Sequence, residues 1–206
     1  MAYGFLDTLS TPAVRATQAA NGARKLWERE DIDRAFDRFT VGESAFIAAR
    51  DSFFMASASE SGWPYVQHRG GPAGFLKVLD ETTLAFADFR GNRQYISLGN
   101  VAAENRVALI LMDYPHRARL KILAHLEVRD VAADPALAAA LALPGYKAVA
   151  ERAFVLKLHA FDWNCAQHIT PRYTASEVAA FVAPMQARIA ELEAENQALR
   201  ARTEGG

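Results

Sequence analysis

The middle of the chain alternates short apolar runs with turn residues, a pattern typical of antiparallel strands. Gly, Pro and acidic residues separate these runs from Ser52 onward. The runs expected to form strands are 52–57, 65–68, 74–79, 83–88, 106–112, 118–129 and 152–164. Six or so antiparallel strands with helices between them predict a mainly β protein with flanking helices, built as a small barrel.

Helices are predicted before and between the strands. Residues 11–36 are rich in Ala, Arg and acidic residues with sparse apolar anchors, which favours helical pieces lying over the barrel. Thr40 and Glu43 have capping-box spacing, so a short helix should end near Arg50. An Ala-rich helix is expected near 135–143. Another should follow Gly91 and face inward with Tyr95, Ile96, Leu98 and Val101.

The C-terminal segment has heptad periodicity. Spacings of three and four residues alternate along Val182, Met185, Ile189, Leu192, Asn196 and Leu199. If Val182, Ile189 and Asn196 are a positions, opposite charges fall at g and e, and Asn196 favours a parallel, two-stranded coiled coil. An amphipathic helix packed on its own barrel is the alternative. Pro184 should interrupt a helix from Ala175, so the seam should begin at or just after Pro184.

Composition and charge narrow the class of protein. At 206 residues and 51% hydrophobic composition, we expect one barrel domain, residues 1–174, and a helical or coiled-coil extension, residues 175–206. The 23 basic and 24 acidic side chains nearly balance, which argues against a dedicated nucleic-acid binder. The single Cys165 excludes an intrachain disulfide, and no signal-peptide or membrane-span pattern is present, so a cytoplasmic protein is expected.

The clearest local candidate for chemistry is the turn after the strand that ends at Asp88. Gly91, Asn92, Arg93 and Gln94 follow that strand and precede a helix. Glycine allows close backbone approach, the first helical amides are free donors, and Arg93 offers a forked cation for phosphate oxygens. The same residues also suit an ordinary solvated turn, so the pattern alone leaves both interpretations open.

The order of several segments resembles a known family. Pro64 to Lys77, the Ala-Phe-Ala-Asp strand, the Gly91 turn and Ala103 to Leu109 follow one another as in the pyridoxamine 5'-phosphate oxidase-related, FMN-binding split-barrel family. The similarity is closest to a subgroup with His-Arg-Gly-Gly-Pro before the third strand and a motif like that of residues 164–172. It implies a split β-barrel homodimer with FMN in a groove at the subunit interface.

The resemblance also assigns cofactor-binding positions. It implies that a basic residue on the third strand and the turn after the fourth grip the FMN phosphate, while the fourth strand runs along the flavin. The residues at these positions are Lys77, Phe86, Ala87, Asp88, Asn92, Arg93 and Gln94.

Two departures separate the chain from the true oxidase. Gln94 stands where the oxidase has a second cation, so the phosphate charge must be met elsewhere, and Arg69 is our candidate. The terminal strand with which the oxidase holds pyridoxamine phosphate is not found, and a heptad helix stands in its place. Pyridoxamine phosphate is therefore not expected as the substrate.

A second polar cluster follows the last strand and contains Trp163, Gln167 and His168. Such side chains suit the edge of a flavin, where donors tune its reduction, although Trp163 could simply cap the barrel and His168 hold a loop carbonyl. The histidine spacings give no zinc pair. One axial histidine would suffice for haem, with His68 or His168 as ligand, so haem is an alternative cofactor.

These features predict an FMN-dependent oxidoreductase. It would pass hydride or electrons between the flavin and a small organic or nicotinamide partner, because the cofactor itself carries that chemistry. Catalytic residues and turnover are left open. The alternatives are a non-catalytic FMN- or haem-binding sensor, and a dimerising scaffold whose coiled coil recruits a partner.

Overall fold

A computed structural model describes residues 4–28, 36–163 and 166–204 of the chain. Its contacts separate two compact units, Met1–Asp113 with Ala118–Gln167, and Tyr114–Arg117 with His168–Gly206. The first unit contains the sheet, and the second contains the long C-terminal helix. The predicted boundary between the barrel and its extension, after residue 174, stays a prediction.

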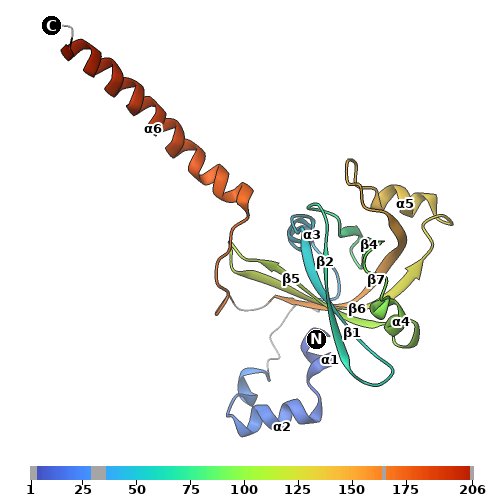
Figure 1. Ribbon diagram of the computed structural model, residues 1–206. Helices are drawn as coiled ribbons and strands as arrows, with labels where there is room; N and C mark the ends of the chain where they lie inside the picture. Colours follow the sequence, from blue (N-terminus) through green and yellow to red (C-terminus); the bar gives the residue numbers. More distant parts are fainter. Residues whose placement is uncertain (1–3, 29–35, 164–165, 205–206) are drawn as a thin grey trace. The chain divides into compact units, whose positions relative to one another are not determined.

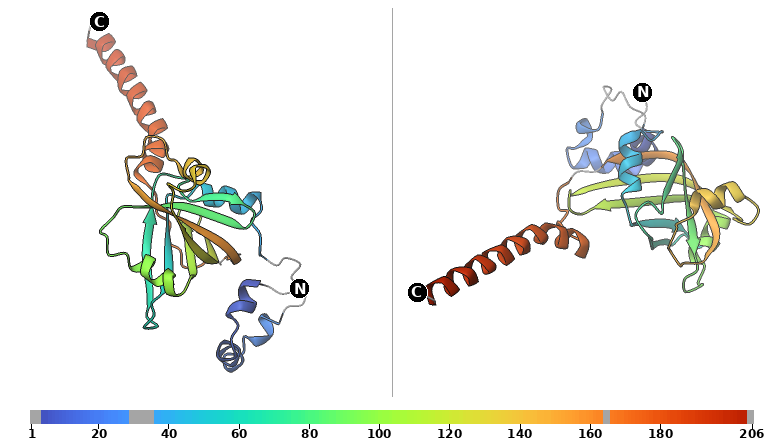
Figure 2. Two further views of the ribbon diagram at one scale, coloured as in Figure 1. Left: turned by 90° about the vertical axis from the view of Figure 1, so that its right-hand side faces the viewer. Right: turned by 90° about the horizontal axis from the view of Figure 1, so that it is seen from above.

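Seven antiparallel strands form one strongly curved sheet, seen from three directions in Figures 1 and 2. They are β1 (Ser52–Ala58), β2 (Pro64–Gly70), β3 (Lys77–Asp80), β4 (Thr83–Phe89), β5 (Arg106–Asp113), β6 (Ala118–Arg129) and β7 (Ala150–Trp163). Their order is β2-β1-β5-β6-β7-β4-β3, so β2 and β3 are edges among the described residues and the barrel stays open. The mainly β split barrel is thus confirmed.

The core is made by alternate residues of the strands. Along β5, Val107, Leu109 and Leu111 are buried while the residues between them are half-buried. The largest internal cluster is aromatic, because the ring of Phe86 lies edge-on to those of Phe53 and Phe154 at 5.2 and 5.3 Å. Period-two alternation therefore gives β5 one face toward the core and one face outward. β4 is buried on both faces, because side chains of α5 pack with Ala85 on its second face.

The helices are α1 (Gly4–Leu9), α2 (Pro12–Ala20), the 3-10 helix η1 (Arg24–Leu26), α3 (Val41–Ala48), α4 (Ile96–Ala103), α5 (Pro135–Leu141) and α6 (Ala175–Glu204). The capping box of α3 is confirmed, since the Thr40 amide donates to Glu43 Oε2 at 2.9 Å. Helical pieces between residues 11 and 36 are also confirmed, although 29–35 lie outside the described residues.

The interruption expected at Pro184 is wrong, because α6 continues through this residue over 30 positions. Proline removes one helical hydrogen bond and crowds the carbonyl four residues earlier. That carbonyl belongs to Ala180, an exposed residue, so water can satisfy it. The helix therefore provides heptad positions on both sides of Pro184.

The inward face of α4 agrees with the expectation only in part, because Val101 is buried and Leu98 packs against the core. Tyr95 and Ile96 are exposed, whereas the polar Ser97 and Asn100 are buried. Both buried groups have partners on the sheet: Ser97 Oγ donates to Gln67 Oε1 at 2.8 Å, and Asn100 Nδ2 donates to Ser57 Oγ at 3.0 Å. Hydrogen bonds as well as apolar packing thus fix α4 against the sheet.

Candidate functional site

A small pocket of about 190 Å³ lies at the turn between β4 and α4. It draws residues from β2, the end of β4, the following turn and the start of β7. Its lining residues are Gln67, Arg69, Asp88, Phe89, Gly91, Asn92, Arg93, Tyr95 and Glu151. We call this cavity the arginine pocket.

Two arginines flank one carboxylate in the wall of this pocket. Asp88 accepts from Arg69 Nη1 at 2.6 Å and from Arg152 Nη1 at 2.8 Å. All three side chains are at most 19% exposed, so the ion pairs are weakly screened by solvent. The β4–β7 pairing produces this arrangement, because Asp88 lies opposite Arg152 in the register.

One hydrogen-bond donor of Arg69 has no acceptor in the described part of the protein. Its Nε atom is buried and makes no hydrogen bond there, although the same guanidinium pairs with Asp88. A buried unsatisfied donor of a charged group carries a desolvation cost of more than about 1–3 kcal/mol. The guanidinium carbon of Arg69 lies 5.3 and 5.8 Å from the ring centres of Phe154 and Phe86, so the group also packs against the aromatic core.

The turn is held by contacts at both of its ends. At its start, the Arg90 amide donates to Val149 O at 2.8 Å and Arg90 Nε donates to Glu151 at 3.0 Å. At its end, the Tyr95 hydroxyl donates to the same carboxylate. Between them Arg93 has φ 62°, a left-handed conformation that costs a non-glycine residue about 1–2 kcal/mol.

Glu151 is kept charged by these neighbours. The Arg90 guanidinium holds the pKa of Glu151 below its ordinary value, and the Tyr95 hydroxyl adds to the effect against the opposing influence of desolvation. Because this pKa is depressed by folding, the stabilisation is present at neutral pH and is lost as the pH falls through the folded-state pKa. The carboxylate therefore remains a fixed anchor for the turn near neutral pH.

The arginine pocket brings together several residues predicted from the sequence. Arg69, Asp88, Asn92 and Arg93 all line it. Asn92 Oδ1 accepts from the Gln94 amide at 3.1 Å, which shapes the turn, while the exposed Gln94 is not a lining residue. Arg93 is exposed and has no ion-pair partner among residues that the structure describes. The replacement of the missing cation by Arg69 stays a prediction.

Three other predicted residues of β3 and β4 lie apart from this pocket. The Phe86 side chain is only 1% exposed inside the barrel. Ala87 lines a separate small cavity beside α5. Lys77 lies opposite Ala85 in the β3–β4 register, and Ala85 packs with the apolar side chains of α5. Lys77 is therefore on the sheet face opposite to Phe86.

The predicted cluster after the last strand is divided between the two units. Trp163 packs edge-on against Phe46 at 4.8 Å and donates to Glu43 Oε1 at 2.8 Å, so it caps the barrel beside α3. Gln167 is exposed and ends the first unit, whereas His168, with φ 63°, begins a segment of the second. Asn164 and Cys165 lie outside the described residues.

Sequence reasoning missed Arg152, Glu151 and Tyr95. Arg152 and Glu151 begin the last strand, and only the register of β7 against β4 brings them to the turn. Tyr95 was expected to face inward, but it is 44% exposed and its ring lies 5.1 Å from the Arg152 guanidinium. The Tyr95 hydroxyl needs a hydrogen-bond partner, and this requirement was the signal in the sequence that could have indicated an outward position.

A second notable surface is the outward face of β2, β1, β5 and β6. Strand register places Phe54 beside His68 on one side and Ile110 on the other, and Ala56 similarly between Val66 and Ala108. Phe54 is 38% and Val66 60% exposed. A cavity of about 650 Å³ lies over part of this face, where His125 and His159 contribute to its rim. We call this surface the outer sheet face.

Neither a metal site nor a membrane-spanning helix is found in the described part of the chain. No group of three or more His, Cys, Asp or Glu side chains there is arranged to hold a metal ion. None of the described helices combines the length and apolar character needed to cross a membrane.

Comparison with protein families gives one match over most of the barrel. The family described as pyridoxamine 5'-phosphate oxidase matches residues 43–162, more than half of the chain. This range includes the arginine pocket and all strands except the last residue of β7. No curated protein matches the chain.

Several solved structures resemble the protein at low sequence identity. A candidate pyridoxamine 5'-phosphate oxidase from Lactobacillus delbrueckii is 20% identical, with a TM-score of 0.47, covering 61% of this chain and 94% of its own. HupZ from Group A Streptococcus is 10% identical, with a TM-score of 0.46 and coverages of 66% and 100%. An FMN-binding protein from Syntrophomonas wolfei is 15% identical, with a TM-score of 0.44 and coverages of 71% and 97%.

Proposed function

The chain belongs to the pyridoxamine 5'-phosphate oxidase family, and from this premise we propose that it binds FMN with the phosphate in the arginine pocket. Arg93, Arg69 and Arg152 would hold the phosphate oxygens. The bound flavin would supply hydride or electron transfer with a small organic or nicotinamide partner, while the protein binds and orients it.

The excess of arginine over carboxylate at this pocket is the observation that carries this proposal. Arg69 and Arg93 line the pocket, and Arg90 and Arg152 pair with its two carboxylates, Glu151 and Asp88. A phosphate monoester carries a charge of about −1.5 to −2 at neutral pH and has three strong acceptor oxygens. The site therefore offers an anion the positive charge that its own two carboxylates leave unbalanced.

Replacing Arg93 with alanine tests the phosphate assignment. We expect FMN to bind about 10- to 100-fold more weakly, because one or more charge-assisted hydrogen bonds of roughly 1.5–3 kcal/mol are lost. Flavin fluorescence titration gives the affinity. Riboflavin, which lacks the phosphate, should bind both proteins equally, and Arg129→Ala removes an exposed arginine of β6 as a matched control.

The absorption of purified protein separates the cofactor alternatives. Flavin bands that persist through purification, or appear on titration with FMN, support the proposal, whereas a Soret band would indicate haem. Unchanged FMN affinity in Arg93→Ala would refute the phosphate site. Anaerobic bleaching of the bound flavin by NADH or NADPH would support turnover, and the absence of bleaching with either would favour a non-catalytic binder.

We also propose that the outer sheet face forms the interface of a homodimer. Its support is the exposed apolar character of Phe54 and Val66, since contiguous apolar patches of this kind usually mark interaction sites. Ile110 lies beside Phe54 within this face. A dimer would cover these side chains and the cavity above them.

Ile110→Asp is expected to convert the dimer into a monomer in a protein whose α6 helix has been prevented from pairing by a second substitution. The measurement is sedimentation equilibrium in a chain that also carries Leu192→Asp, which places a charge in the heptad seam of α6. A charge buried without a partner in the interface opposes association. Val41→Asp, at an exposed apolar position of α3, is the matched control and should leave the mass unchanged. A dimer that survives Ile110→Asp would contradict the assignment.

A further inference from the structure

The helix α6 presents an apolar stripe with no cover in the described second unit. Ile189 is 55%, Leu192 46% and Leu199 62% exposed. Helices gain most of their stability by packing an amphipathic face rather than from intrinsic propensity. At 30 residues α6 extends about 45 Å, so the stripe is long. A partner is needed to bury it.

We propose that this partner is α6 of a second copy of the chain, in a parallel, in-register, two-stranded coiled coil. The a positions that precede Asn196 hold the β-branched residues Val182 and Ile189. The d positions include Leu192 and Leu199. β-Branched residues at a combined with Leu at d favour two parallel strands. The helix continues through Pro184, so Val178 adds a further d position on the other side of the proline.

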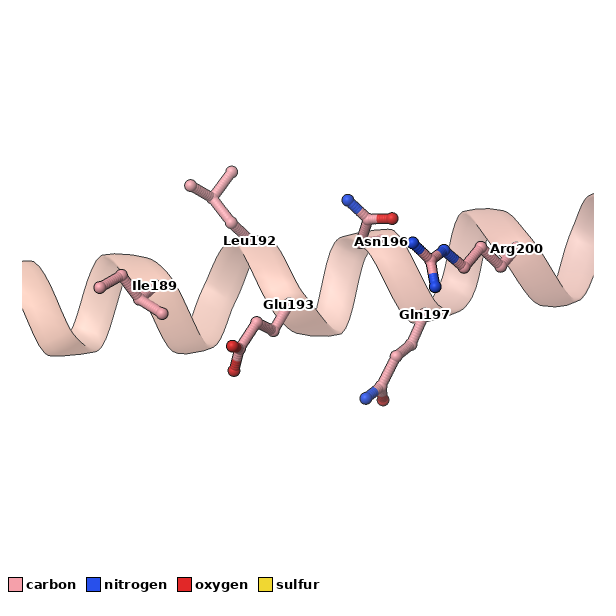
Figure 3. A pocket seen from close by; sticks show the side chains of 6 residues that line it. All are labelled: Ile189, Leu192, Glu193, Asn196, Gln197 and Arg200. Atoms are coloured by element: carbon pink, nitrogen blue, oxygen red, sulfur yellow. The ribbon is translucent and has the colours of Figure 1, made fainter.

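Asn196 selects the orientation of the pair. Figure 3 shows its amide on the same side of α6 as Leu192, with Glu193 and Gln197 pointing away. In a parallel, in-register pair the two Asn196 amides face each other and can hydrogen-bond across the seam. An antiparallel pair sets a positions against d positions, so each amide would face an apolar side chain and lose its partner.

The charges beside the seam select the register. In the parallel, in-register pair, g-to-e contacts bring Arg188 of one helix to Glu193 of the other, and Glu195 to Arg200. A shift by one heptad would instead bring Arg188 to Arg200 and Glu195 to Glu193. In the single chain, Arg188 pairs with Glu191 of its own helix at 2.8 Å. This ion pair is exposed, so replacing it with a pair across the dimer costs little free energy.

Cysteine cross-linking in the full-length chain tests this pairing. In a Cys165→Ala background, Thr203→Cys places a thiol at the last a position, and Ala201→Cys places one at an outward f position two residues earlier. With oxidised glutathione as oxidant, we expect Thr203→Cys to form the intermolecular disulfide roughly tenfold faster or more than Ala201→Cys. Of these two positions, only 203 faces the seam and brings the β-carbons of both helices close together.

Three further variants separate the seam from chance encounters and from barrel dimerisation. Leu192→Asp should abolish the advantage of Thr203→Cys. Arg188→Glu should slow cross-linking, and addition of Glu193→Arg should restore it. Equal rates at positions 201 and 203, no disulfide at 203, insensitivity to Leu192→Asp, or failure of the charge swap to restore the rate would each overturn the proposal. FMN titration of the same proteins is independent of these outcomes.

Discussion

Asp88→Ala is expected to lower the free energy of unfolding by about 3–5 kcal/mol, because it removes the shared partner of two largely buried guanidinium groups. Arg69 and Arg152 both donate to this carboxylate, and each is less than 20% exposed. Without Asp88 they would repel each other in a poorly solvated site. Urea unfolding followed by tryptophan fluorescence measures the change.

A surface carboxylate provides the control for this prediction. Glu127 pairs with Arg129 where both side chains are more than 40% exposed, so Glu127→Ala should cost less than about 1 kcal/mol. Added inorganic phosphate should recover part of the stability of Asp88→Ala, because an anion that binds only the folded state stabilises it. A loss as small as that of Glu127→Ala would contradict a buried ion-pair role.

Phe86→Ala should be equally severe, at about 3–5 kcal/mol, because it opens a cavity among tightly packed rings. Phe86 is 1% exposed and contacts Phe53 and Phe154 edge-on. Thermal or urea unfolding of the barrel gives the value. Phe181→Ala, at a position of α6 that is 71% exposed, should leave barrel stability within about 0.5 kcal/mol.

Phe86 also separates a core role from contact with the flavin. The family resemblance assigns this position to the strand along the flavin, whereas its side chain lies inside the barrel. Phe86→Leu keeps most of the apolar volume, so it should retain FMN affinity together with most of the stability. A folded Phe86→Leu protein that no longer binds FMN would show that the ring contributes to the cofactor site.

The strands could be predicted because apolar runs bounded by turn residues mark most of them. β6 has the expected bounds, Ala118–Arg129, and β5 alternates buried with half-buried residues as a sheet with one inner face requires. The expected strand from Gly74 to Leu79 was too long, because Gly74 has φ 77° in a turn that precedes β3. Period two identifies a strand better than it places its ends.

The candidate site was only partly predictable, because register is a property of two strands together. The sequence marks Arg93 and its turn locally, but it does not say which residue of β7 lies opposite Asp88. A shift of the pairing by one residue would send Arg152 to the other face of the sheet. The inward turn of Ser97 and Asn100 was missed for a similar reason, since their acceptors lie on β2 and β1.

The Asp88 carboxylate already pairs with Arg69 and Arg152 when no ligand is bound. Folding has already restricted the Arg69 and Arg152 side chains, so an incoming phosphate avoids an ordering cost of about 0.5–1.5 kcal/mol for each of them. The same carboxylate repels anions, so it lowers the affinity of the pocket for small ions such as free phosphate, which interact with it through charge alone. A ligand whose aromatic ring makes additional contacts outside the pocket can overcome that repulsion. Asp88 would therefore make the site selective for phosphorylated aromatic compounds over free phosphate.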